Sequence, residues 1–131
     1  MSFNHPVSDL VSTLKNGYLA KSQTVSMPVS KLRENILTIL KEEGYILNYA
    51  KIKNGSHDRF NISLKYHNSS PVLNEISVVS KPGRKIYCSS KEIPLVKNGL
   101  GMVLISTSHG VVPDYVARTK NLGGEILLKI F

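Results

Sequence analysis

Apolar residues in the first half of this chain switch between two spacings, and this switch limits the fold more than any other feature. They recur every three or four residues over residues 5–16 and again between Ser30 and Gly44, then alternate with polar residues over residues 60–66. The first spacing is typical of an amphipathic helix and the second of a strand with one wet face. The residues concerned are Val7, Leu10, Val11 and Leu14, then Leu32, Ile36, Ile39 and Leu40, and finally Phe60, Ile62, Leu64 and Tyr66.

Capping and turn residues predict where these elements end. Gly17 closes the first helix, Ser30 caps the start of the second helix, and Gly44 stops it. The pair Asn54-Gly55 is a strong hairpin signal. Two further strands are predicted over residues 23–27, ending at Pro28, and over residues 45–53, so this half has the order α-β-α-β-β.

The second half has a different character. The segment HNSSP, residues 67–71, has no apolar residue before Pro71 and is interpreted as a linker between domains at residues 1–66 and 72–131. Pro113 is placed to open a short helix that reaches about Lys120. We predict an α/β protein of the α+β kind, with two small packed domains, the second mostly β with one short helix. Its strands are expected over residues 75–80, 86–88, 101–106 and 125–131.

The charge indicates a polyanionic partner. Among 131 residues there are 17 Lys and Arg against 9 Asp and Glu, a net charge of +8. Nucleic acid is the first expectation and an anionic membrane surface the second, although a merely soluble basic protein would share this composition. No apolar run approaches the roughly 20 residues of a membrane span. The lone Cys88 fits a reducing compartment, so we expect a cytoplasmic protein with no membrane partner.

Catalytic patterns are weak. Ser106, Ser108, His109 and Asp114 are residue types of a hydrolase triad, but the chain has no G-x-S-x-G nucleophile elbow. Its four histidines are scattered and Cys88 has no cysteine partner, so no metal-ligand spacing exists. We expect no enzymatic activity, no cofactor and no metal.

Two segments carry residues that suit RNA. KPGRKIYCSSK, residues 81–91, places Arg84 and Lys85 beside Tyr87, and cations next to an aromatic ring suit phosphate contact with base stacking. A solvated hairpin with Tyr87 partly in the core is the alternative. The region of Lys81 to Lys85 is called the basic turn below.

The second segment with residues that suit RNA is ISTSHGVV, residues 105–112. Ser106, Thr107 and Ser108 bring three hydroxyls into one turn, with Gly110 to let the backbone turn tightly; residues 106–110 are called the hydroxyl turn below. These hydroxyls could satisfy their own backbone. Three in a row leave spare donors and acceptors, which favours recognition of an unpaired base and its sugar.

A family resemblance follows from these segments. GMVLISTSHGVVPDYVAR, residues 101–118, resembles the signature of the universal small-subunit ribosomal protein eight family, bacterial type. The likeness covers nearly the whole chain, because HPVSDLVSTLKNG, MPVSKLRENILTILKEEGYI, KPGRKIY, IPLV and LGGEIL resemble the other blocks of that family in the same order.

The resemblance implies a structural component of the small ribosomal subunit that binds the central domain of small-subunit ribosomal RNA directly and assists its assembly. It also implies neighbouring ribosomal proteins as partners and, in some bacteria, the protein's own messenger RNA. A non-ribosomal RNA-binding regulator stays open, as does a hydrolase that uses Ser108 and His109. The residues that the resemblance assigns to RNA are Ser106, Thr107, Ser108, Gly110, Tyr87, Arg84 and Lys85, with Glu125 beside the hydroxyl turn and Lys15, Asn16 and Lys31 in the N-terminal domain.

The chain departs from the family pattern at several positions. His109 stands where the family usually has Lys or Arg, and Tyr115 where it often has Arg. Cys88-Ser89-Ser90 is less basic than usual after Tyr87. These departures predict fewer phosphate contacts in the C-terminal half with the mode of binding unchanged.

Overall fold

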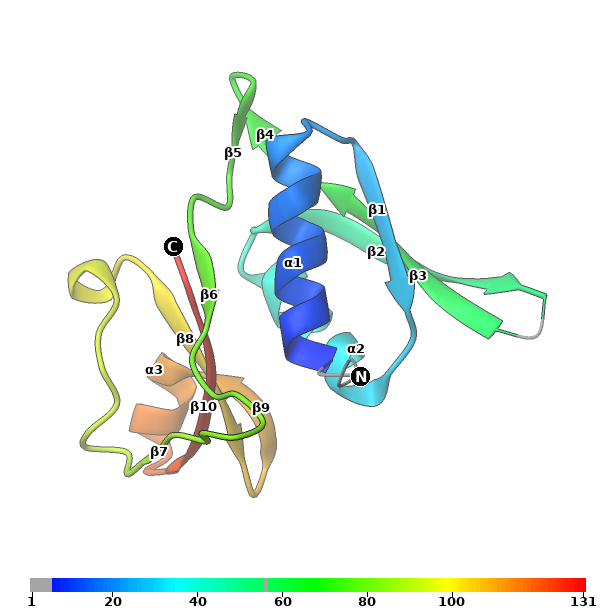
Figure 1. Ribbon diagram of the computed structural model, residues 1–131. Helices are drawn as coiled ribbons and strands as arrows, with labels where there is room; N and C mark the ends of the chain where they lie inside the picture. Colours follow the sequence, from blue (N-terminus) through cyan, green and yellow to red (C-terminus); the bar gives the residue numbers. More distant parts are fainter. Residues whose placement is uncertain (1–5, 56) are drawn as a thin grey trace. The chain divides into compact units, whose positions relative to one another are not determined.

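The computed structural model describes residues 6–55 and 57–131. Among these described residues, three α-helices and several antiparallel sheets confirm the predicted α+β fold class (Figure 1). The chain divides into two compact units, the N-terminal unit Met1–Leu73 and the C-terminal unit Asn74–Phe131. No membrane-spanning helix is found among the described residues.

The N-terminal unit has the predicted order of elements. Its sheet has the strand order β1-β3-β2 with antiparallel pairing throughout, and both helices lie on the same side of it (Figure 1). The apolar positions predicted for β3 are buried, since Phe60 and Ile62 are fully inaccessible and Leu64 nearly so. The elements are α1 (Pro6–Leu19), β1 (Thr24–Pro28), α2 (Lys31–Glu42), β2 (Ile46–Asn54) and β3 (His57–Leu64).

Gly17 does not end the first helix, which continues to Leu19. A side chain on Gly17 would overlap Val25 on β1 and come within 3.0 Å of the Leu64 side chain. This glycine therefore lets α1 pack closely against the sheet, and the prediction that it stops the helix is wrong.

The ends of α2 follow the sequence. The Arg33 backbone N–H donates to Ser30 Oγ at 3.1 Å, which confirms the predicted cap. Gly44 has a φ of +83°, the left-handed conformation that glycine adopts most easily. Arg33 itself is buried and donates to the Pro28 carbonyl at 2.9 Å and to Asp9 Oδ2 at 3.2 Å, so it ties three elements together.

The predicted linker segment contains a tight hairpin. Asn68 and Ser69 both have positive φ, which makes a two-residue turn between β4 (Tyr66–His67) and β5 (Ser70–Pro71). Tyr66 donates its hydroxyl to the Ser22 carbonyl at 2.6 Å, so this hairpin is fastened to the N-terminal unit. The division between the two units follows Leu73.

The C-terminal unit is mostly β, as predicted. Its sheet has the order β6-β10-β8-β9, and β7 also pairs with β10. One face of this sheet packs on α3 through a cluster of Val103, Ile105, Ala117, Ile126 and Ile93. The elements are β6 (Ile76–Val78), β7 (Tyr87–Cys88), the 3-10 turn η1 (Lys97–Gly99), β8 (Met102–Thr107), β9 (Gly110–Pro113), α3 (Asp114–Thr119) and β10 (Gly124–Ile130).

Strand β9 is an element that the sequence analysis missed. Pro113 pairs with Leu104 at the end of β9 and precedes the first residue of α3, with an extended ψ of 158°. The prediction that Pro113 is the first helical residue is therefore wrong by one position. Asp114 is that first residue, and its buried carboxylate pairs with Arg118 at 2.9 Å.

Candidate RNA-binding surface

The hydroxyl turn is the tip of the β8–β9 hairpin. Thr107 and Gly110 face each other at its base, and Gly110 has a φ of +101°. Thr107 Oγ1 donates to the Gly110 carbonyl at 2.8 Å and accepts from the His109 backbone N–H at 3.1 Å. One of the three hydroxyls therefore holds the turn itself. Within the described residues, the side-chain hydroxyls of Ser106 and Ser108 make no hydrogen bond, which leaves both for a ligand.

Strand pairing brings three predicted site residues into one row. Glu125 on β10 lies opposite Tyr87 on β7 and, on its other side, opposite Ser106 on β8. Residues directly opposite in antiparallel strands share a face, so these three side chains project together. The Tyr87 ring is 65% exposed and can accept a stacked base without rearrangement. The row lies on the sheet face opposite α3, because Ser106 alternates with the core residue Ile105.

Two glycines at the start of β10 let neighbouring backbone come close to this row. A side chain on Gly124 would overlap the Ser106 carbonyl and lie 3.2 Å from the Thr107 Cα atom. A side chain on Gly123 would lie 2.7 Å from the Cys88 carbonyl oxygen. In the sequence these two glycines were noted only as part of the LGGEIL block that resembles the family. Paired glycines at the start of a strand are a signal of close backbone approach that could have identified them.

The basic turn is also anchored to β10. Lys81 and Arg84 exchange two backbone hydrogen bonds of 3.0 and 2.9 Å, which closes a tight turn. The buried Ser80 accepts from the Ile86 N–H at 3.0 Å and donates to the Ile126 carbonyl at 2.5 Å. Ser80 is thus a positioning residue that sequence reasoning missed, and a hydroxyl beside a basic run offers no clear signal of it. Lys81, Arg84 and Lys85 are all exposed.

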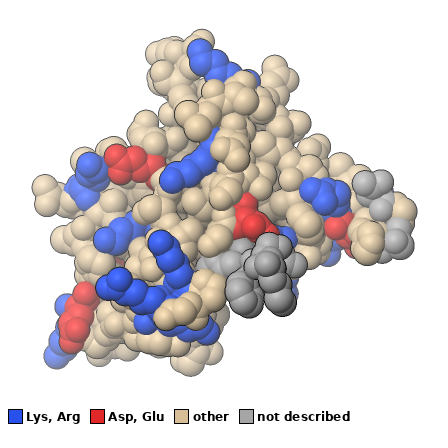
Figure 2. Space-filling view, in the orientation of Figure 1, with Lys and Arg blue, Asp and Glu red and all other residues tan. Residues whose placement is uncertain are grey.

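The charge near this surface is positive. Figure 2 shows a group of Lys and Arg side chains at the lower left of the view, where Figure 1 draws the chain between β6 and β7. Burial raises the pKa of the Cys88 thiol, and nearby Glu92 raises it further against a lowering effect of Arg118. The thiol next to Tyr87 therefore stays neutral at physiological pH and adds no negative charge that would repel phosphate.

The N-terminal site residues lie apart from one another. Lys15 and Asn16 are exposed on α1, and Lys31 is the exposed first residue of α2. Arg33 Nε donates to the Pro6 carbonyl at 3.2 Å, so the start of α2 is held at the start of α1. Lys15 is nine residues beyond Pro6 on α1, about 14 Å along the helix axis. The three N-terminal positions that the sequence assigned to RNA thus form no concentrated site with one another.

The candidate hydrolase residues Ser108, His109 and Asp114 do not form a catalytic triad within the described residues. Asp114 is engaged by Arg118, which also donates to the Pro94 carbonyl at 2.9 Å. Within the part of the chain that the structure describes, no hydrogen bond joins Ser108, His109 and Asp114. The arrangement of these residues favours binding over nucleophilic catalysis.

Comparison with known proteins decides the family. The family model described as Ribosomal protein S8 matches residues 5–131. The chain belongs to this family. The small ribosomal subunit protein uS8 of Erythrobacter litoralis is 45% identical over 131 residues, with both chains covered completely. The proteins of the same name from Hyphomonas neptunium and Caulobacter vibrioides are 44% and 46% identical over their full lengths. The family resemblance predicted from the sequence is confirmed.

Proposed function

We propose that this protein is a structural component of the small ribosomal subunit and binds small-subunit ribosomal RNA directly. The observation that carries the proposal is the row of Tyr87, Glu125 and Ser106 beside the hydroxyl turn. It combines a stacking ring, an acceptor and a hydroxyl on one face, which is the chemistry that an unpaired base and its ribose require. Membership of a family whose relatives are named as small-subunit proteins supports the same assignment.

Each group has a distinct role in this proposal. Arg84 and Lys85 in the basic turn hold the RNA backbone, while a base stacks on Tyr87. Ser106 and Ser108 hydrogen-bond the sugar and base edges, and Glu125 accepts from an amino or 2′-hydroxyl group. Thr107 acts through the shape of the turn, since its hydroxyl is already engaged. Gly110 permits the tight backbone at the tip.

The N-terminal unit adds less specific contacts. Lys15, Asn16 and Lys31 approach the RNA backbone and raise affinity without reading sequence. The RNA is the central domain of the small-subunit ribosomal RNA, and the protein assists its assembly. Its other partners are neighbouring small-subunit proteins and, in organisms that regulate this way, its own messenger RNA. It acts in the cytoplasm, on the ribosome, and has no catalytic role.

Footprinting on intact small-subunit ribosomal RNA tests this proposal. The protein should protect one irregular helix of the central domain at moderate salt, and a regular duplex of equal length should compete poorly. Tyr87→Ala should remove protection next to the stacked base, whereas Tyr87→Phe should retain it. Protection of messenger fragments alone would favour the regulator instead. Absence of any selective protection by the wild-type protein would contradict RNA binding of this kind.

A further inference from the structure

The N-terminal unit has a polar sheet face that no site above uses. Strands β1, β3 and β2 pair in register, so every second residue points away from α1 and α2. None of these outer-face positions in the described strands holds an acidic residue. The outer face consists of Thr24, Ser26 and Pro28 on β1, Asn48, Ala50 and Ile52 on β2, and His57, Arg59, Asn61 and Ser63 on β3.

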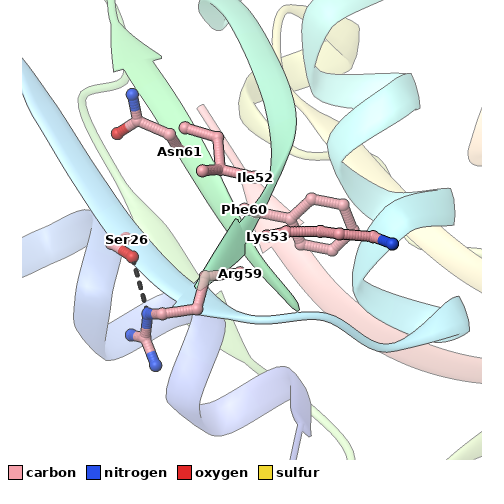
Figure 3. Close-up of a pocket in the computed structure, with 6 residues that line it drawn as sticks. All are labelled: Ser26, Ile52, Lys53, Arg59, Phe60 and Asn61. Atoms are coloured by element: carbon pink, nitrogen blue, oxygen red, sulfur yellow. Dashed lines mark hydrogen bonds between the residues drawn. The ribbon is translucent and has the colours of Figure 1, made fainter. Parts of the chain in front are cut away.

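A hollow of about 200 Å³ lies at the centre of this face, lined by residues of all three strands. Arg59 Nε donates to Ser26 Oγ at 2.8 Å, which fixes the direction of the guanidinium group (Figure 3). Asn61 is opposite Ser26 in the sheet and lies near Ile52 (Figure 3). Ile52 lies on the outer face and is 48% exposed, whereas Phe60 is fully buried with its side chain on the opposite face of the sheet. Lys53 also lines the hollow, but its side chain lies beside Phe60 and points away from Arg59 and Asn61 (Figure 3).

We propose that this outer face binds a second, irregular segment of RNA, separate from the segment held by the C-terminal unit. This inference rests on the proposed ribosomal RNA binding. A guanidinium held at Nε still presents its two terminal nitrogens, which can donate together to one phosphate. The Asn61 amide and the Ser26 hydroxyl supply donors and acceptors for a 2′-hydroxyl or a base edge.

Charge and polarity favour RNA over a protein on this face. Arg59 places a cation in the hollow, and neither the residues that line the hollow nor the outer-face positions named above include a carboxylate, so an anion is the complementary ligand. A protein interface depends on a fully buried apolar centre. Here one half-exposed isoleucine is the only exposed apolar side chain of the hollow.

The test compares two outer-face variants with a matched control. Arg59→Gln removes the guanidinium, and Asn61→Asp places a carboxylate in the hollow with almost no change of shape. Lys51→Gln removes one charge from the exposed edge of β2, at a position opposite Phe60 and hence off the outer face. Thermal unfolding checks that each variant is folded, and affinity and footprints are measured on intact small-subunit ribosomal RNA.

We expect Arg59→Gln and Asn61→Asp each to weaken binding by about fivefold and to lose protection of one group of nucleotides. Tyr87→Ala should keep protection of that group and lose protection elsewhere. Lys51→Gln should leave both groups protected. Wild-type footprints in folded Arg59→Gln and Asn61→Asp would overturn the inference and leave the proposed function standing.

Two other results are equally decisive. If the outer-face variants bind RNA normally but enter the subunit poorly when the other small-subunit proteins are present, the face contacts a protein and the RNA inference is wrong. If the wild-type protein protects no ribosomal RNA, the proposed function fails and this inference fails with it.

Discussion

The two units of this protein present their polar groups in opposite ways. In the C-terminal unit, strand pairing gathers Tyr87, Glu125 and Ser106 into one row, and Ser80 anchors the basic turn to the same strand. In the N-terminal unit, Lys15 and Lys31 lie on different helices. Concentrated and oriented groups can discriminate between RNA structures, whereas dispersed cations attract any phosphate. The difference predicts that selectivity for the RNA held beside the hydroxyl turn belongs to the C-terminal unit, and that the helix cations of the N-terminal unit add general affinity.

The largest expected effect concerns the cores beneath the two surfaces. Leu104→Ala and Ile62→Ala each empty a fully buried strand position and should lower the free energy of unfolding by about 2–5 kcal/mol. Only Leu104→Ala should also reduce selectivity for the RNA held beside the hydroxyl turn, because Leu104 precedes Ser106 on the same face of β8. Urea unfolding with parallel footprinting measures both quantities. Equal loss of selectivity in the two variants would break the contrast between the units.

The next effect is on stacking. Tyr87→Ala should weaken binding to the specific RNA by roughly 1–3 kcal/mol, the usual contribution of one base stacked on an aromatic ring. The exposed Tyr87 ring supports no core, so the thermal midpoint should stay unchanged. Filter binding against specific RNA and a regular duplex provides the measurement. A similar loss for both RNAs would mean that Tyr87 does not read structure.

Hydrogen bonding should contribute less. Ser108→Ala removes a hydroxyl that has no partner within the described residues, and it should cost about 1 kcal/mol of binding, or up to about 3 if an RNA group is left buried and unpaired. Thr107→Ala is the internal comparison, because it removes the two hydrogen bonds that hold the turn. Thr107→Ala should therefore speed amide hydrogen exchange in the turn and also weaken RNA binding. If Ser108→Ala kept full affinity and selectivity, the hydroxyl turn would serve only as a chain reversal and would not recognise RNA through Ser108.

The smallest single effect is expected from exposed cations. Lys15→Gln and Lys85→Gln should each reduce the slope of log affinity against log salt by roughly 1, because each neutralised phosphate releases counterion. Neither change should alter the preference for specific RNA over duplex. Titrations between low and moderate salt give the slopes. If Lys15→Gln changed the preference for specific RNA over duplex, the N-terminal unit would also discriminate between RNA structures, and the contrast between the two units would be wrong.

Local sequence signals predicted much of the fold. The spacing of Phe60, Ile62 and Leu64 identified β3 and its buried face, and Ser30 identified the start of α2. Gly17 was misjudged because a glycine that permits close packing and a glycine that ends a helix look alike in sequence. Strand β9 was missed because its four residues are too few for a periodic pattern and depend on pairing with β8.

The family resemblance confirmed by comparison was carried by short segments of sequence, and the candidate residues of both turns were visible in them. Their arrangement was not. Glu125 comes to lie between Tyr87 and Ser106 only because β10 pairs with β7 and β8, and Gly124 admits the β8 backbone at that point. Sequence by itself determined which residues could hydrogen-bond, stack or carry charge, since those are properties of side chains. Tertiary structure decided which hydroxyls remained available and which groups shared a face, because both depend on contacts between strands distant along the chain.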